Sequence, residues 1–212
     1  METIAVVDYS LGNLRSVSKA VEHVAPDARV LVTDDPALID EADRVVFPGQ
    51  GAARDCMKAI SDHHVEKAVR NAAATRPFLG ICMGLQVLMQ RSEENDGTDL
   101  LGLFDGEVRR FSGTAIGDNG LPLKIPHMGW SRVNQVLEHP LWHGIEDGTR
   151  FYFVHSYFVV PEEQSLVAAT TEYGETFTCA IEHENLFAVQ FHPEKSADAG
   201  LQLIKNFINW RP

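Results

Sequence analysis

The sequence predicts an α/β fold in which helices flank an open, mainly parallel sheet and antiparallel strands occupy the C-terminal half. Three observations support this prediction. Short apolar runs alternate with amphipathic helical segments through the first half of the chain, which is typical of a parallel sheet with crossover helices. Strand-like segments then follow one another between residues 106 and 190, and a final amphipathic segment closes the chain.

In the first half, strand and helix patterns take turns. Strands are predicted at 4–7, 29–32, 44–47 and 76–81, and the first three are apolar enough to be buried on both faces. Apolar residues at helical spacing predict helices between or after them. The stripes are Leu14, Val17, Ala20, Val21 and Val24, then Cys56, Ile60, His64, Ala68 and Val69, then Leu85, Leu88 and Met89.

The second half contains a series of strand patterns that we interpret as antiparallel pieces extending or covering the sheet. They lie at 108–111, 130–133, 151–154, 166–170, 177–181 and 186–190. An amphipathic helix is predicted over about residues 199–210. Because no stretch has the composition of a linker, we expect a single domain over residues 1–212.

Composition narrows the classes of function. A formal net charge of −12 argues against general nucleic-acid binding, because a phosphate backbone would be repelled. The N-terminus lacks the pattern of a secretory signal, and no apolar run approaches the roughly 20 residues of a membrane helix. Three cysteines without a Cys-x-x-Cys pair are typical of a reduced protein. We therefore expect a cytoplasmic protein without membrane association, metal or cofactor.

A candidate nucleophile stands directly after the fourth strand. The segment Gly80-Ile81-Cys82-Met83-Gly84 has the Gly-x-nucleophile-x-Gly form of a nucleophile elbow, with cysteine in place of serine. Flanking glycines permit a sharp strand-to-helix turn, and the N-terminus of the following helix favours a thiolate. The same five residues also fit a buried structural cysteine between two packing glycines. Cys56 and Cys179 lack this context and are expected in the core.

A candidate base follows the last predicted strand. His192 stands just beyond 186–190, where an open α/β sheet gathers its active site. Pro193 stiffens the turn, and Glu194 can fold back to orient the imidazole and stabilise its charged form. Taken alone, these residues could form a surface turn. Together with Cys82, they favour a Cys82, His192 and Glu194 catalytic set.

A glycine turn after the third strand completes the candidate site. Gly49, Gln50 and Gly51 follow the strand at 44–47, and glycines there let backbone N–H groups approach a developing oxyanion. The partner donor would be the backbone N–H of Met83. Arg54 occupies the third glycine position of a dinucleotide-binding fingerprint, which argues against such a loop.

These three features together resemble the class I (triad) glutamine amidotransferase domain over the whole chain. Three further segments, 8–17, 126–130 and 152–157, resemble the glutaminase subunits of imidazole glycerol phosphate synthases. Three residues within or directly after those segments and turns depart from the family pattern: Gln50 replaces an apolar residue, Ser131 an asparagine, and Ser10 a glycine.

The resemblance implies a function in histidine biosynthesis. Cys82 would attack the side-chain amide of glutamine, and ammonia would pass to a separate (β/α)8 cyclase subunit in a heterodimer. That subunit would make imidazole glycerol phosphate and the purine intermediate AICAR. Residues implied to bind glutamine are Gln86, Glu94, His155, Ser156 and Tyr157. Residues implied to face the cyclase are Asn13, Trp130, Tyr152 and Lys195.

Three alternatives stay open at this point. The chain could serve a different synthase, such as one of pyridoxal phosphate, anthranilate or guanine nucleotide synthesis. It could be a binding module that kept the fold without the reaction, which an intact Cys82, His192 and Glu194 disfavours. It could also be a stand-alone thiol hydrolase, whose turnover would not respond to a cyclase subunit.

Overall fold

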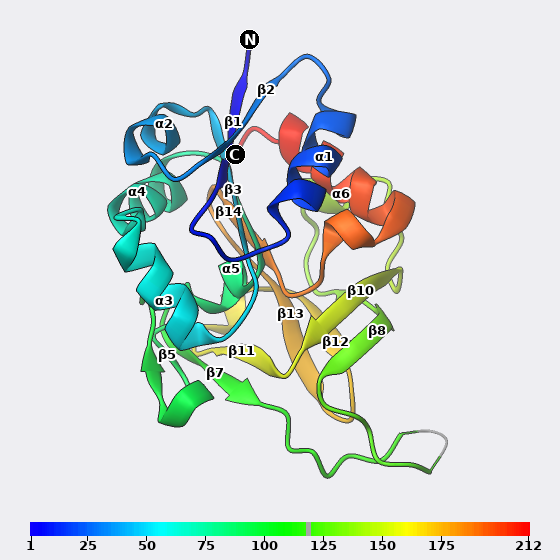
Figure 1. Ribbon diagram of the computed structural model, residues 1–212. Helices are drawn as coiled ribbons and strands as arrows, with labels where there is room; N and C mark the ends of the chain where they lie inside the picture. The colour runs from blue at the N-terminus through cyan, green and yellow to red at the C-terminus, as the bar shows by residue number, and fades with distance from the viewer. Residues whose placement is uncertain (118–119) are drawn as a thin grey trace.

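The computed structural model describes residues 1–117 and 120–212 and is built on one mixed sheet (Figure 1). The strand order is β2-β1-β3-β4-β14-β13-β11-β7-β5-β6. From β2 to β14 all neighbours are parallel, as they are in doubly wound α/β folds. These strands are β1 (Thr3–Val7), β2 (Arg29–Thr33), β3 (Arg44–Gly49), β4 (Phe78–Cys82) and β14 (Leu186–Val189).

Beyond β14 the sheet continues mainly with antiparallel pairs, from β14 to β13, β11 and β7. β12 adds to β13 and carries β9, whereas β8 and β10 form a separate two-stranded antiparallel sheet. The bounds are β5 (Arg91–Ser92), β6 (Thr98–Asp99), β7 (Gly106–Arg110), β8 (His127–Arg132), β9 (Asn134–Gln135), β10 (Arg150–His155), β11 (Tyr157–Pro161), β12 (Val167–Glu172) and β13 (Thr176–His183).

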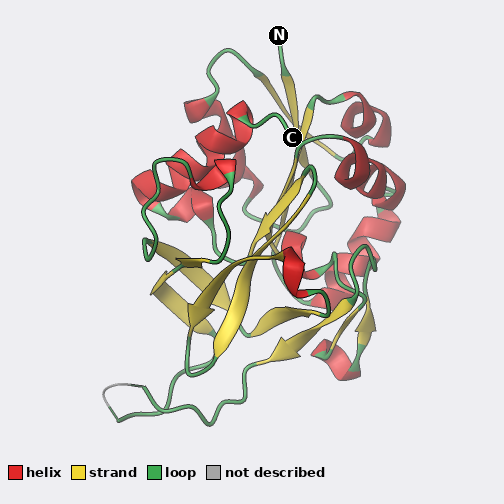
Figure 2. Ribbon diagram, turned by 180° about the vertical axis from the view of Figure 1, so that it is seen from behind, coloured by secondary structure: helices red, strands yellow, loops and turns green. Residues whose placement is uncertain are grey.

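Helices cover both faces of the parallel half (Figures 1 and 2). α1 (Leu14–Val24) and α6 (Ala197–Asn209) lie on one face. On the other lie α2 (Pro36–Glu41), α3 (Ala53–Asp62) and α4 (Glu66–Thr75). Side chains of each strand alternate between the two resulting cores: Val6 packs with α1 and α6, and its neighbour Ala5 packs with α2, α3 and α4.

Short helices complete the described chain. The helix that follows β4 is α5 (Met83–Gln86). Four 3₁₀ turns are described: η1 (Glu94–Asp96), η2 (Pro140–Trp142), η3 (Gln164–Leu166) and η4 (Pro193–Lys195). Among the described helices, none combines the length and the apolar character needed to cross a membrane. Asn119, which the sequence places in a turn with Gly120, lies outside the described residues.

The predicted fold class is confirmed, while several elements differ from their predictions. The segment at 29–32 is an edge strand rather than a buried one, and Val32 is 45% exposed. The strand at 186–190 was predicted to be antiparallel, but β14 runs parallel to β4 and antiparallel to β13. It is buried along its whole length, which explains its continuous apolar sequence.

Two predicted helices are interrupted. The stripe from Cys56 to Val69 is divided between α3 and α4, because His64 between them has a φ of 57°. The helix predicted through Met89 ends at Gln86. There the carbonyls of residues 87–89 accept hydrogen bonds from the backbone N–H groups of residues 101–103. Tertiary contacts therefore replace the helical bonds that the local pattern predicts.

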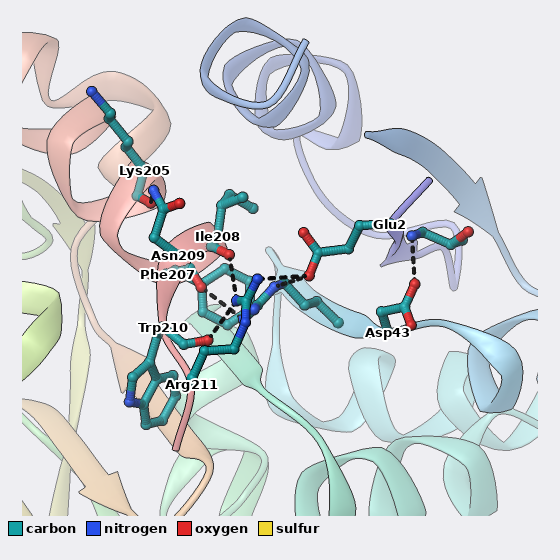
Figure 3. A network of polar contacts seen from close by, with 10 residues as sticks. Glu2, Asp43, Lys205, Phe207, Ile208, Asn209, Trp210 and Arg211 are labelled. Atoms are coloured by element: carbon teal, nitrogen blue, oxygen red, sulfur yellow. Dashed lines mark hydrogen bonds and ion pairs between the residues drawn. The ribbon is translucent and has the colours of Figure 1, made fainter. Parts of the chain in front are cut away.

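A buried arginine ties the two ends of the chain to the amino end of β3 (Figure 3). The Arg44 side chain is 2% exposed; its Nε donates to Oε1 of Glu2 at 2.8 Å, and its Nη1 donates to the carbonyl of Phe207 at 2.9 Å. Arg211 lies 3.7 Å from the same Glu2 oxygen. This network lies at the end of the sheet opposite to the carboxyl ends of β3, β4 and β14.

Candidate active site

The carboxyl ends of three adjacent parallel strands bring the predicted site residues together. Gly49 at the end of β3 pairs with Cys82 at the end of β4, and Ile81 pairs with Val189 at the end of β14. The glycine turn, the cysteine and the segment that carries His192 therefore leave the sheet side by side. Open α/β sheets place their ligand sites at this edge.

Cys82 occupies the sharp turn that the sequence predicts. Its backbone angles are φ 57° and ψ −108°, a conformation that costs a non-glycine residue about 1–3 kcal/mol. The flanking glycines are required by space: a Cβ on Gly80 would lie 2.7 Å from the Gly84 carbonyl oxygen, and one on Gly84 would lie 1.8 Å from that of Phe47. The following helix has only four residues, so the extended helix dipole expected from the sequence is not present.

His192 is held from both sides. Its Nδ1 lies 2.9 Å from Oε1 of Glu194, and both side chains are almost fully buried. The backbone N–H of His192 donates to the Tyr152 carbonyl at 2.9 Å, and the Ser196 hydroxyl donates to the His192 carbonyl at 2.7 Å. The imidazole is thus fixed in place, and Nε2 is the nitrogen left for proton transfer.

The charge of the imidazole follows from its neighbours. Burial lowers the pKa of His192, but the Cys82 sulfur near the ring and the Glu194 carboxylate bonded to it outweigh burial and raise that pKa to about 10. Among the described residues, Nε2 has no partner at ordinary hydrogen-bond geometry. Cys82 is therefore near enough to influence the ring electrostatically, without forming a short bond to it.

The glycine turn is braced by two side chains. A Cβ on Gly49 would lie 2.1 Å from the Tyr9 hydroxyl, so the turn and Tyr9 are in close contact. The Cys56 thiol donates to the Gln50 carbonyl at 3.4 Å. Gly51 has a φ of +105°, which favours glycine. Gln50, which departs from the family pattern, lines the cavity described below.

A cavity of about 410 Å³ joins most of the predicted residues, within the size range of small-molecule sites. Gly49 and Glu194 are not among the residues that line it. Its lining is Gln50, Gly51, Cys82, Met83, Gln86, Glu94, Pro126, Val154, His155, Ser156, Tyr157, His192 and Lys195. A cavity of about 680 Å³ lies near Leu186, at the other end of β14. We place the site in the smaller cavity, because it contains the cysteine and the histidine.

The residues implied to bind glutamine differ in the hydrogen bonds that they make to other protein atoms. Oε2 of Glu94 accepts from the backbone N–H of Ala53 at 2.7 Å. The Gln86 amide nitrogen lies 3.0 Å from the Tyr157 carbonyl oxygen. His155 is hydrogen-bonded through both ring nitrogens, to His127 and to the Tyr157 carbonyl. Its ring is therefore engaged by protein atoms, although it lines the cavity.

Gln190 was not singled out from the sequence, yet it contacts the candidate nucleophile. Its Nε2 lies 3.6 Å from Sγ of Cys82, and its Oε1 lies 3.0 Å from Nε2 of Gln86. The side chain is fully buried. A polar residue at the end of the apolar strand 186–189 is the signal that could have identified it, because buried amides require partners.

Two of the four residues implied to face a partner, Trp130 and Tyr152, lie on the β8–β10 pair. Trp130 is 47% exposed, so it is not a core aromatic. It pairs with Tyr152, with ring centroids 6.1 Å apart, and Nζ of Lys195 lies 6.0 Å from the Tyr152 ring. Asn13 is half-buried just before α1. Lys195 also lines the cavity, so this surface is continuous with the site.

The remaining cysteines and a surface histidine have structural contacts. Cys56 and Cys179 are fully buried, as predicted. His63 contacts the Ser10 hydroxyl and the Asp34 carboxylate, at 3.1 and 3.0 Å. Ser10 has a φ of 66°, which accounts for the glycine usual at that position of the family. Among the described residues, no group of three or more His, Cys, Asp or Glu side chains is placed to hold a metal.

Comparison with known proteins identifies the family of the chain. The sequence profile described as "Glutamine amidotransferase class-I" matches residues 5–210. The chain belongs to the class I glutamine amidotransferase family. Two relatives within the family are each named "Imidazole glycerol phosphate synthase subunit HisH". That of Thiobacillus denitrificans is 60% identical, over 99% of this chain and 92% of its own length. That of Nitrosomonas europaea is 55% identical over the whole of both chains.

Solved structures show the same glutamine amidotransferase fold at low sequence identity. The glutaminase domain of Trypanosoma brucei CTPS with bound acivicin superposes with a TM-score of 0.64 at 18% identity, covering 100% of this chain and 96% of that one. PurLQS of Thermotoga maritima gives a TM-score of 0.67 at 18% identity, with 98% of both chains covered. The solved structures, at 18% identity, show only the fold. The relatives at 60% and 55% identity narrow the similarity to one group within the family.

Proposed function

We propose that this chain is the glutaminase subunit of imidazole glycerol phosphate synthase, which releases ammonia from glutamine for a cyclase subunit. One observation carries the chemistry: the cavity that contains Cys82 also contains His192, whose Nδ1 lies 2.9 Å from Glu194. Relatives at 53–60% identity that carry this subunit name support the pathway. This proposal names Cys82 as nucleophile, His192 as base and Glu194 as the residue that orients the base.

The reaction follows from these roles. His192 takes the proton of the Cys82 thiol, and the sulfur attacks the side-chain amide carbon of glutamine. His192 then gives the proton to the leaving nitrogen, so that ammonia departs and a glutamyl thioester forms. Water, activated by the same imidazole, cleaves the thioester and returns the thiol and glutamate. A raised pKa of His192 favours this cycle, because an imidazolium beside the sulfur stabilises the thiolate.

The oxyanion that forms in each step needs backbone donors. We assign this task to the N–H of Met83 and to the turn of Gly49, Gln50 and Gly51. In support, Met83, Gln50 and Gly51 all line the cavity beside Cys82. The thiol of Cys56, which bonds the Gln50 carbonyl, limits how the peptide between Gln50 and Gly51 can be oriented.

Glutamine would lie along the wall formed by residues 154–157. Glu94 is suited to the α-ammonium group, because it is the carboxylate among the residues that line the cavity. Gln86, Ser156 and Tyr157 would position the rest of the substrate. We propose that His155 shapes this wall rather than bonding the substrate through its ring, since both ring nitrogens are occupied.

The cyclase subunit would dock over the exposed β8–β10 pair and the mouth of the cavity. Trp130, Tyr152, Lys195 and Asn13 would face it, and Lys195 belongs to both the cavity and this surface. Direct transfer into the partner would keep ammonia from becoming ammonium in bulk water. A partner that covers the mouth of the cavity would keep ammonia out of bulk water in this way.

A glutaminase assay tests the proposal. The purified chain is mixed with a cyclase subunit of histidine biosynthesis, and glutamate release is followed with and without the nucleotide substrate of the cyclase. Cys82→Ala serves as the control. We expect release that requires the cyclase, increases with the nucleotide and disappears in the control. Glutamate release that is the same with and without the cyclase would indicate a stand-alone hydrolase. The absence of glutamate release from a verified complex would contradict the proposed triad.

A further inference from the structure

Gln190 is a buried polar residue next to the candidate nucleophile, and the mechanism above does not use it. It follows β14 directly, and its side chain is fully buried. Its backbone N–H donates to the Cys179 carbonyl at 2.8 Å, which fixes the main chain at this point. The side chain is therefore free of any backbone role, and its own contacts decide what it does.

The direction of its hydrogen bonds can be deduced from the backbone carbonyl of Tyr157. That carbonyl can only accept, so the group of Gln86 that lies 3.0 Å from it must be the NH₂. The second hydrogen of the same NH₂ then points to Gln190, 3.0 Å away, which must present its oxygen. The NH₂ group of Gln190 is left facing Sγ of Cys82 at 3.6 Å.

We infer that Gln190 is a positioning residue that donates a hydrogen bond to the Cys82 sulfur and favours its thiolate. The inference rests on the proposed function, in which Cys82 is the nucleophile. Because an amide N–H can only donate, it bonds a thiolate more strongly than a thiol. Gln190 therefore stabilises the sulfur after its proton has moved to His192, and it adds no charge that would oppose the imidazolium.

The same amide connects the nucleophile to the substrate wall. The chain of contacts runs from Sγ of Cys82 through Gln190 and Gln86 to the carbonyl of Tyr157, and Tyr157 lines the cavity. The direction of the sulfur is thus set relative to the place where glutamine would lie. A shift of Gln190 would change both the charge state of the sulfur and its direction of attack.

The test is the pH dependence of alkylation of Cys82 by iodoacetamide in the isolated chain. Labelled peptides are separated by mass, because Cys56 and Cys179 are also free thiols. The variants are Gln190→Met, which keeps the volume and loses the amide, and Gln190→Asn, whose shorter amide cannot reach both neighbours. Gln135→Met is the matched control, since Gln135 donates to the Ile145 carbonyl away from the site.

In both Gln190 variants we expect alkylation of Cys82 at neutral pH to slow about ten-fold or more, the usual effect of losing a hydrogen bond to a charged group. The midpoint of the pH profile should move to higher pH, which loss of packing alone would not cause. Gln135→Met should match the unsubstituted chain. A folded Gln190→Met with an unchanged profile would overturn the inference.

A second measurement needs no substitution at Gln190. The side-chain amide proton resonance of Gln190 should move downfield when Cys82 is converted to the thiolate, and this movement should vanish in Cys82→Ala. A Gln190 amide resonance that does not move when Cys82 becomes a thiolate would also overturn the inference. Neither experiment uses glutamine or the cyclase subunit. A chain without glutaminase activity can therefore still show the Gln190 effect, and the two proposals fail independently.

Discussion

Nδ1 of His127 lies 3.0 Å from Nε2 of His155, and the two rings form one directed chain of hydrogen bonds. Burial lowers the pKa of both rings, so both are neutral at pH 7. His155 Nδ1 donates to the Tyr157 carbonyl at 2.8 Å, and in the neutral ring its Nε2 then accepts from His127. The Nε2 of His127 then accepts from the Ser131 hydroxyl at 2.8 Å. The serine that stands at residue 131 in place of the family's asparagine thus supplies the donor at the start of this chain of hydrogen bonds.

Because these two histidines are buried and neutral, we expect the free energy of unfolding to fall in acid. Burial lowers the pKa of His155 to about 3 and that of His127 to about 4, from 6.5. Between pH 6.5 and these values, the unfolded chain binds protons that the folded chain does not bind. The free energy of unfolding therefore falls as the pH falls, by about 1.4 kcal/mol per pH unit for each full proton.

The variant His155→Gln tests this dependence by urea unfolding between pH 3.5 and 7.5. Glutamine can still donate and accept, but it does not titrate. We expect the free energy of unfolding of the variant to change less steeply with pH over most of this range. The slope should be smaller by about 1.4 kcal/mol per pH unit, which corresponds to one proton. Parallel curves for the variant and the unsubstituted chain would show that His155 does not resist protonation.

The glycines of the cysteine turn give a prediction on stability. A Cβ on Gly84 would meet the Phe47 carbonyl oxygen at 1.8 Å, whereas one on Gly51 would meet no atom within 4 Å. We expect Gly84→Ala to lower the free energy of unfolding by about 3 kcal/mol or more, because the backbone must move. Gly51→Ala should cost about 1–2 kcal/mol, from backbone strain at φ +105°. Urea unfolding of both variants measures this, and equal losses would contradict the geometric account.

Sequence patterns predicted four of the five parallel strands, and the structure brings Cys82 and His192 into one cavity, for a physical reason. Strands such as β1 and β3 are buried on both faces, so their apolar runs are unmistakable, and Cys82 and His192 follow the ends of such strands. The contact that requires glycine at 80 is local, since it is with the Gly84 carbonyl, whereas glycine at 84 is required by the Phe47 carbonyl on the neighbouring strand β3.

The parts that could not be predicted depend on contacts between distant segments. The early end of α5 is caused by N–H groups of residues 101–103, and nothing in its own sequence reports them. The link from Gln190 to Cys82 spans 108 residues of sequence. Likewise, the exposure of β2 follows from its place at the edge of the sheet, which the apolar pattern at 29–32 does not encode.

We expect the substitution Glu194→Gln to change both the charge state of His192 and the rate of glutamate release. Burial lowers the pKa of His192, while Cys82 and Glu194 raise it to about 10. Removing one of the two negative neighbours should lower that pKa, which a nuclear magnetic resonance titration of the ring measures. Glutamate release by the complex with the cyclase should fall about a hundred-fold or more, because the imidazolium loses its partner.

The same substitution has a stability consequence with a defined sign. A raised folded-state pKa stabilises the chain fully below pH 6.5, and this stabilisation is lost as the pH rises through about 10. In Glu194→Gln the alkaline loss should begin near the same pH but end at lower pH, so that its total is smaller than in the unsubstituted chain. Glu162→Gln, at an exposed glutamate, is the control and should change neither the titration nor the rate. An unchanged His192 titration in Glu194→Gln would refute the pairing.

The exposed face of β8 and β10 gives the last prediction. Trp130 is 47% exposed and packs against Tyr152 at its edge, so it contributes little to the core. Exposed aromatics of this kind are frequent binding hot spots. We expect Trp130→Ala to weaken binding of the cyclase subunit by about 2 kcal/mol, or about 30-fold in Kd. The free energy of unfolding should change by about 0.5 kcal/mol or less.

Titration calorimetry with the cyclase subunit and urea unfolding of the free chain measure the two quantities. Val32→Ala is the matched control, because Val32 is 45% exposed on β2, at the far edge of the sheet. It should leave the affinity unchanged. Equal weakening by both substitutions would mean that exposed apolar area in general drives association. No weakening by Trp130→Ala would place the cyclase on another face, and the mouth of the cavity at Lys195 would then have to open to solvent rather than to the partner.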